Sequence, residues 1–250
     1  MSRILLIETA SEVCSVAIAV DGRVVAHVED LQAPSHAALL TLQIEACSAA
    51  AGLTLASIDA IALSSGPGAY TSLRVGSSVA KGICYALGKP LIAVDTLLAL
   101  ACGAQQWYHQ TYQDTDQVVY APALDARRQE IWTALYSADL QLLAPARPIV
   151  LEDNLFENFI FPGVPDNKPI RAILSGNGVE KVLSGLSTEK AVLFSPIRCS
   201  AIHLAMMAEQ LFQNIDFQDI AYFEPFYMKP PNITTPNNAI IGHKNSFITI

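Results

Sequence analysis

The sequence predicts an α/β protein made of two related halves. Each half opens with three short strands joined by tight turns, and it continues with units in which helices alternate with strands. A shift of 117 residues along the chain superposes the two openings and pairs Glu8 with Asp125 and Cys14 with Ile131. Few residues are identical between the halves, so the repeat is one of pattern. The cleft between two such halves is the expected place for a ligand.

The first half is predicted to span residues 1–106. Apolar alternation and the hairpin signal Asp21-Gly22 predict its three opening strands. Ser35 opens the first helix and Gly52 ends it. The predicted elements are strands at 3–8, 14–20 and 23–28, a helix at 35–51, a strand at 58–63, a helix at 73–87, a strand at 91–94 and a helix at 96–106.

The second half is predicted to span residues 107–228. Its elements follow the same order, with strands at 118–124, 130–136, 140–143 and 172–174, a helix after residue 178 and a helix at 200–212. Residues 229–250 are rich in Pro and Asn, which predicts an extended or disordered tail.

The composition narrows the classes of function. Charged residues make up 15% of the chain, below the usual ~25%, which indicates an apolar surface for a partner protein. The net charge of −8 argues against binding nucleic acid without a partner, so any tRNA would be reached only indirectly. The mean hydropathy is +0.34, yet no run approaches the ~20 apolar residues that cross a membrane, and no signal peptide precedes the first strand.

The cysteines fit a cytoplasmic protein. Five are present, widely spaced and without a Cys-x-x-Cys pair, so the sequence predicts neither a disulfide framework nor a zinc site. The five histidines form no metal-binding pair by spacing. We therefore expect no metal site in this chain.

A Gly-Pro-Gly turn, residues 66–68, joins a predicted strand to a predicted helix. Gly66 and Gly68 permit positive φ, so the turn could bring backbone N–H groups and a helix N-terminus to a ligand or another chain. The alternative is a tight crossover turn without a ligand.

Glu8 and Asp125 end the first strand of each half and could face each other across the cleft. Two carboxylates there suit a magnesium–nucleotide site, with Gly66 and Gly68 beside them. This would support a small-molecule kinase or ATPase. The alternative is that each carboxylate caps its own turn, and residues 9–11 lack the glycine that lets backbone approach a phosphate.

Two helices are candidates for an interface with another subunit. Gly76, Ala80 and Cys84 share one helix face, and their small side chains would let a second helix approach closely. Packing within the same half is the alternative. The helix at 36–51 is apolar on more than one face and should bury more than one face. The predicted interface residues are His36, Leu39, Leu40, Gln43, Cys47, Arg74, Gly76, Ala80 and Cys84.

Five segments resemble the bacterial TsaB (YeaZ) family. They are residues 7–10, 14–17, 65–76, 123–131 and 225–229, of which 65–76 is the most specific. The resemblance implies an actin-like fold of the hexokinase and Hsp70 type with two βββαβαβα-like halves. It also implies a part in making N6-threonylcarbamoyladenosine beside the anticodon of tRNA. Older descriptions of this superfamily as peptidases find no supporting residues here.

The resemblance further implies a non-catalytic subunit. Such a chain pairs with its paralogue TsaD, which transfers the threonylcarbamoyl group, and the ATPase TsaE completes the complex. The pairing helices would be those at 36–51 and 73–87, ATP and magnesium would act through the partners, and this chain would need no cofactor. In the absence of TsaD, the same apolar surface predicts a homodimer.

Two positions support the non-catalytic interpretation. The metal-binding histidines of the catalytic paralogue correspond to Thr96 and Leu100, and neither side chain can replace an imidazole ligand. Glu8 stands where the family more often has Asp, which puts an independent nucleotide site further in doubt.

Overall fold

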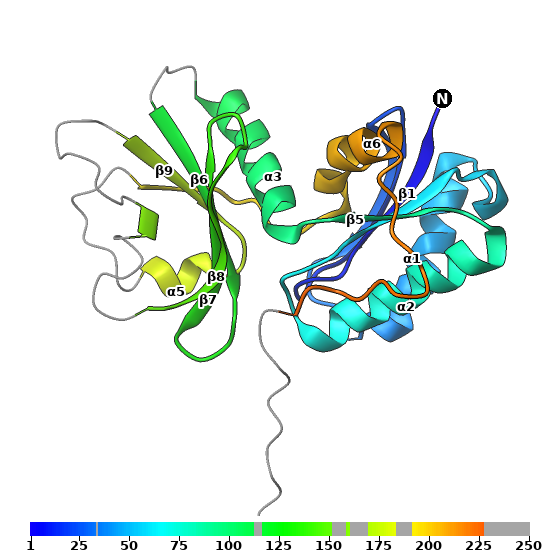
Figure 1. Ribbon diagram of the computed structural model, residues 1–250, viewed down its shortest axis with the longest axis horizontal. Coiled ribbons are helices and arrows are strands. Elements are labelled where there is room, and N and C mark those ends of the chain that lie inside the picture. Colours follow the sequence, from blue (N-terminus) through cyan, green and yellow to red (C-terminus); the bar gives the residue numbers. More distant parts are fainter. Residues whose placement is uncertain (34, 113–116, 152–158, 161–169, 184–191, 228–250) are drawn as a thin grey trace, which may run out of the picture.

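Two five-stranded mixed sheets organise the chain. The computed structural model describes residues 1–33, 35–112, 117–151, 159–160, 170–183 and 192–227 (Figure 1). The first sheet has the order β3-β2-β1-β4-β5, antiparallel from β3 to β1 and parallel from β1 to β5. Its strands are β1 (Arg3–Glu8), β2 (Cys14–Val20), β3 (Arg23–Asp30), β4 (Ala60–Ser64) and β5 (Leu91–Val94).

The second sheet repeats the first. Its order from one edge is β8-β7-β6-β9-β10, with the same change from antiparallel to parallel pairing at its centre. Its strands are β6 (Gln117–Asp125), β7 (Glu130–Ser137), β8 (Leu142–Val150), β9 (Ile170–Ser175) and β10 (Val192–Phe194). This duplicated order is the topology of the actin-like α/β fold, so the predicted fold class is confirmed.

Alternate residues of the first sheet face two different layers. Leu5 and Ile7 point toward α1 (His36–Ala51) and α2 (Tyr70–Leu87), whereas Ile4 and Leu6 point toward a 3-10 turn, η2 (Ala201–Leu204), and α6 (Ala205–Gln213). Such two-sided burial explains why β1 is apolar from Ile4 to Ile7. A short 3-10 turn, η1 (Leu55–Ser57), leads from α1 into β4.

The two halves exchange helices. Helix α3 (Thr96–Thr111) follows β5 but packs mainly on β6 and β9 of the second sheet. It does so through its own buried residues, such as Leu97 and Tyr108. Helix α6 follows the last strand of the second sheet in the chain but packs on the first sheet (Figure 1). The predicted boundary between residues 106 and 107 falls inside α3, because the helix continues to Thr111. The short helix α5 (Val179–Leu183) packs beside β6.

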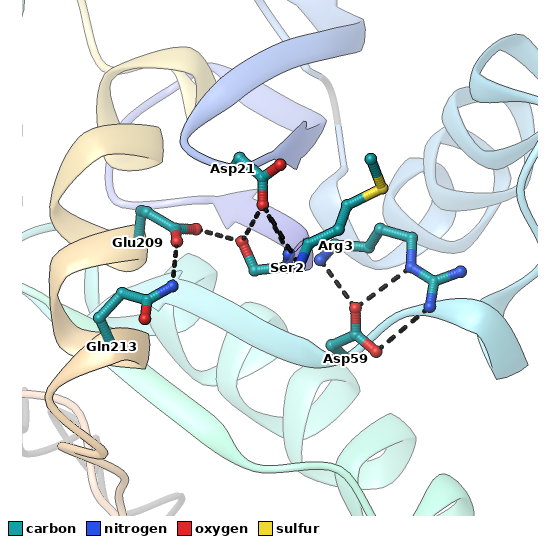
Figure 2. Close-up of polar contacts among 7 residues, drawn as sticks. Ser2, Arg3, Asp21, Asp59, Glu209 and Gln213 are labelled. Carbon is teal, nitrogen blue, oxygen red and sulfur yellow. Dashed lines mark hydrogen bonds and ion pairs between the residues drawn. The ribbon is translucent and has the colours of Figure 1, made fainter.

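Polar contacts tie α6 to the start of the chain. Ser2 donates its backbone N–H to Asp21 at 2.8 Å, and its hydroxyl donates to Glu209 of α6. Arg3 donates its backbone N–H and its Nε to Asp59, at 2.8 and 3.2 Å (Figure 2). These contacts hold residues 2–3 against the β2–β3 turn, α6 and Asp59, which precedes β4.

The helices of the structure test the prediction that no segment crosses a membrane. In the described ranges, none of the helices combines the length and the apolar composition that a membrane crossing requires. The predicted tail at 229–250 lies outside the described residues.

Candidate functional site

Glu8 is buried at the end of β1 and caps its own turn. Its Oε1 accepts hydrogen bonds from the Ala10 N–H at 2.6 Å and from the Ser64 hydroxyl at 2.9 Å, and only 1% of the residue is exposed. Burial raises the pKa of this carboxyl from 4.5 to about 7, although the hydrogen bonds favour the charged form. The capping alternative is therefore correct for Glu8.

Glu8 should make the stability of the protein fall as the pH rises. The folded state holds its proton up to about pH 7 and the unfolded state only up to about pH 4.5, so deprotonation between these values opposes folding. A shift of this size corresponds to about 3 kcal/mol. Glu8→Gln should remove this part of the dependence, which urea unfolding at pH 5 and pH 8 measures. An unchanged difference in the variant would contradict this assignment.

Asp125 ends β6, and its carboxylate accepts hydrogen bonds from residues of its own half. Its Oδ1 accepts from the Arg127 N–H at 2.6 Å and from Lys181 Nζ at 2.5 Å. Asn177 Oδ1 accepts the Asp125 N–H at 3.0 Å, and the same side chain donates to Glu12 Oε2 of the other half at 2.5 Å. The halves thus meet through Glu12 and Asn177 at this point.

The two carboxylates do not form the predicted magnesium–nucleotide site in this conformation. Each is bonded to its own turn, and Asp125 is neutralised by Lys181. Within the described ranges, no three His, Cys, Asp or Glu side chains come together as metal ligands. Sequence reasoning missed Glu12, Asn177 and Lys181. The available signal was the Ser-Gly-Asn-Gly turn at 175–178, which is the counterpart of Ser-Gly-Pro-Gly at 65–68.

The Gly-Pro-Gly turn packs against the protein itself. Gly66 has φ +110°, and a Cβ there would lie 2.6 Å from the Phe226 carbonyl oxygen. A Cβ at Gly68 would lie 2.5 Å from the Ala10 carbonyl oxygen. The Gly66 N–H donates to Thr96 Oγ1 at 3.0 Å, and the Ala69 N–H donates to Ala10 at 2.7 Å. These N–H groups hold a crossover turn together, as the alternative to a phosphate cradle predicted.

Thr96 and Leu100 both lie in the protein interior. Thr96 is fully buried and accepts the hydrogen bond from the Gly66 N–H. Leu100 is 1% exposed in the core that α3 forms with the second sheet.

The small-residue stripe of α2 faces the interior of the subunit. A Cβ at Gly76 would collide with Thr9 Oγ1, and Ala80 and Cys84 lie in the core between α2 and the first sheet. Burial raises the pKa of the Cys84 thiol to about 12. For Gly76, Ala80 and Cys84, packing within the same half is therefore the correct alternative.

Most residues chosen for the α1 interface also point inward. Leu40 and Cys47 are fully buried, Gln43 is 7% exposed, and His36 Nε2 lies 3.1 Å from the Val13 carbonyl oxygen. The prediction that these buried side chains contact a partner is therefore wrong, because a partner cannot reach them. Leu39 is half-buried, and Arg74 is exposed with its guanidinium 5.4 Å from the centre of the Tyr70 ring.

Sequence reasoning selected helix α1 for an interface, but apart from the half-buried Leu39 it did not select residues of the exposed outer face. Its exposed residues are Ala37, Ala38, Thr41, Leu42, Glu45, Ala46, Ala49 and Ala50. Glu45 carries the only charge among them, and Leu42 is 60% exposed. Surface helices of globular proteins usually carry a charged or polar outer face. An outer face this poor in charge is typical of a protein–protein contact.

A groove separates α1 from α2 beside this face. We call it the α1–α2 groove; its volume is about 430 Å³, and it is lined mainly by Ile44, Ser48, Leu53, Leu55, Val79 and Ile83. The outer face of α1 and this groove form one continuous apolar surface, because Thr41, Glu45 and Ala49 belong to both.

A family model described as "TsaD: tRNA N6-adenosine threonylcarbamoyltransferase" matches residues 24–242, which is well over half of the chain. The chain belongs to this family. Its predicted resemblance to the TsaB/YeaZ members is confirmed by the individual relatives.

Two curated relatives of this TsaB/YeaZ-family chain are each called "tRNA threonylcarbamoyladenosine biosynthesis protein TsaB". The one from Escherichia coli is 35% identical over 137 residues, which cover 55% of this chain and 56% of the relative. The one from Haemophilus influenzae is 33% identical over 129 residues, which cover 52% and 51%. The chain thus spans about half the length of the curated relatives that it matches.

A solved structure extends the likeness to nearly the whole fold. It is an uncharacterized protein "with similarity to peptidase YEAZ" from Pseudomonas aeruginosa, with a TM-score of 0.74 and 25% sequence identity. The superposition covers 92% of this TsaB/YeaZ-family chain and 100% of the other.

Proposed function

We propose that this chain is a non-catalytic subunit that supports the synthesis of N6-threonylcarbamoyladenosine in tRNA. In this proposal it binds a TsaD-type paralogue through the outer face of α1 and the adjoining α1–α2 groove. The observation that carries the proposal is the outer face of α1, a sixteen-residue helix with Glu45 as its single exposed charge. The names of the TsaB relatives supply the pathway.

The environment of the strand-end carboxylates supports a non-catalytic role. A kinase or ATPase of this fold would use carboxylates that are free to hold a magnesium–nucleotide complex. Here Glu8 is buried and bonded to Ala10 and Ser64, and Asp125 is paired with Lys181. The chemistry would then belong to the TsaD-type partner.

The remaining parts of the complex follow from this assignment. The TsaD-type paralogue forms a heterodimer with this chain, and a TsaE-type ATPase completes the assembly, so that ATP and magnesium act through the partners. The chain itself requires no cofactor and meets tRNA only indirectly, in keeping with its net charge of −8. Without its partner it forms a homodimer through the same apolar surface, and it acts in the cytoplasm.

Reconstitution tests the proposed function. A mixture of the TsaD-type and TsaE-type proteins, tRNA and threonylcarbamoyl donor should form modified tRNA only when this chain is added. We expect its omission to lower the initial rate at least tenfold, because the partner would lose its binding surface. Mass spectrometry of digested tRNA measures the product.

Two results would contradict the proposal. One is an unchanged rate of modification without the chain. The other is tight binding of Mg–ATP to the isolated chain, with turnover that Glu8→Gln abolishes, which would favour the small-molecule kinase. Titration calorimetry on the isolated chain distinguishes this second case.

A further inference from the structure

Strand β3 ends the first sheet with an edge that another strand can join. It is eight residues long and contains no proline, and its Val24 and Val25 are 38% and 52% exposed. A β-bulge at Val25 interrupts its pairing with β2, and residues 26–30 pair regularly. Among the described residues, the backbone of residues 23–30 forms hydrogen bonds only to β2. The outward N–H and C=O groups of this edge are therefore available to a further strand.

The other three sheet edges are protected. At the β5 edge, the Gln218 N–H donates to the Leu91 carbonyl oxygen at 2.8 Å, so part of that edge is already paired. Strand β8 contains Pro145 and Pro148, which have no N–H to donate to a neighbouring strand. Strand β10 has only three residues. Negative design of this kind prevents edge-to-edge association, and β3 lacks both the prolines and the covering segment.

Arg23 and Asp30 give β3 opposite charges at its two ends. In the pairing with β2, Arg23 lies opposite Val20, and Asp30 lies opposite Cys14. Cys14 and Ile18 face the core beneath α1, and Val20 continues this alternation. Opposite residues of an antiparallel pair share a face of the sheet, so both charges lie on the α1 side. Neither forms an ion pair within the ranges that the structure describes, which leaves both available to a second chain.

The flank of α1 above this edge suits a second copy of the same helix. Helix α1 lies over β2 and β3, whereas α2 lies over β1, β4 and β5, so the side of α1 away from the α1–α2 groove is directed toward the open edge. Leu39, Ala46 and Ala50 share that side, opposite to Thr41 and Glu45, which line the groove. With strands about 4.8 Å apart, pairing of two β3 strands places the two α1 axes about 10 Å apart, close to the spacing of packed helices.

We propose that two copies of the chain associate through antiparallel pairing of their β3 strands, which joins their first sheets into one continuous sheet. A two-fold axis near Ala26 and His27 places Arg23 of each copy against Asp30 of the other, so one contact contains the ion pair twice. The helix layer continues across the contact through Leu39 and the neighbouring alanines of α1. This contact differs from a homodimer through the α1–α2 groove, and it does not depend on a TsaD-type partner.

Charge reversal in the full chain tests the pairing. Arg23→Glu and Asp30→Arg each bring like charges together at both ends of the contact, so each should raise the dissociation constant of the dimer about tenfold or more. The double variant should restore the constant to within about threefold of the wild type. An equimolar mixture of the two single variants should also dimerise, because each charge at the contact then meets its opposite. Sedimentation equilibrium measures the association, and far-ultraviolet circular dichroism confirms that each variant is folded.

Two controls locate the contact. Thr41→Arg adds a charge on the exposed groove side of α1 and should leave the dissociation constant of the dimer within about twofold of the wild type. Hydrogen exchange at low and high protein concentration reports on the backbone. Raising the concentration should slow exchange of the amides of residues 24–30, because their outward N–H groups become bonded, and it should leave β8, the edge strand with two prolines, unchanged.

Three results would overturn the proposal. The first is a wild-type chain that stays monomeric at millimolar concentration. The second is a dimer that Thr41→Arg disrupts and both charge reversals leave intact, which would assign the contact to the α1–α2 groove. The third is a loss of the dimer in both single variants that neither the double variant nor the mixture restores. All of these measurements use the isolated chain, so a failure of the proposed function in reconstitution would leave this contact standing.

Discussion

Replacing Gly76 with alanine is expected to lower the free energy of unfolding by about 3 kcal/mol, within the range for overpacking a core. The new methyl group would overlap Thr9 Oγ1 and would also lie 3.3 Å from Thr9 Cβ and Cγ2, so rotation of the threonine does not relieve the contact. Thr9 is 2% exposed and adjoins Glu8, which fixes the turn after β1. Urea unfolding with a shared slope measures the loss.

Gly82 provides the matched control on the same helix. It is exposed, and apart from its chain neighbours and the backbone of its own helix, no described atom lies within 4 Å of the Cβ that alanine would add. Gly82→Ala should stabilise the protein by about 0.5–1 kcal/mol through helix propensity. Combining Thr9→Ala with Gly76→Ala should restore most of the lost stability. Equal effects of Gly76→Ala and Gly82→Ala would refute the packing of the stripe against Thr9.

Placing an arginine at Leu42 is expected to weaken binding of the TsaD-type partner about thirtyfold or more. The guanidinium would be placed at the centre of the apolar outer face of α1, and its burial in the contact with the partner costs about 2–5 kcal/mol. Leu42 is 60% exposed in the isolated chain, so the fold should be unaffected. Biolayer interferometry with the immobilised partner measures the affinity.

Leu142→Arg is the control for this variant. Leu142 is 59% exposed, nearly the same as Leu42, but it lies on the edge strand β8 of the second sheet. Its substitution should leave the affinity within twofold of the wild type. If Leu42→Arg binds like the wild type, the partner uses another surface.

The sequence predicted the architecture well because local signals carried it. The Asp21-Gly22 hairpin and the alternation of apolar residues located the opening strands, and the shift of 117 residues found the internal repeat. The placement of Glu8 and Asp125 at the ends of equivalent strands is also confirmed. These features depend on residues close together in the chain or on a repeated pattern.

The inward face of each interface helix could not be predicted in the same way. Helix α1 is apolar on several sides, so its composition does not say which side meets the sheet and which meets a partner. Small residues such as Gly76 suit a neighbouring helix and a neighbouring strand equally well. The exchange of α3 and α6 depends on contacts between distant segments, for which the sequence holds no local signal.

The return of α6 to the first sheet has a consequence for synthesis on the ribosome. Leu204 and Ala208 cover the face of the first sheet that includes Ile4 and Leu6, yet 110 residues separate α6 from the last strand of that sheet. At translation rates of about 5–20 residues per second, this face stays uncovered for on the order of 6–22 s. The N-terminal half therefore emerges as an incomplete folding unit, and the nascent chain presents an apolar sheet face to chaperones until its final quarter has left the ribosome.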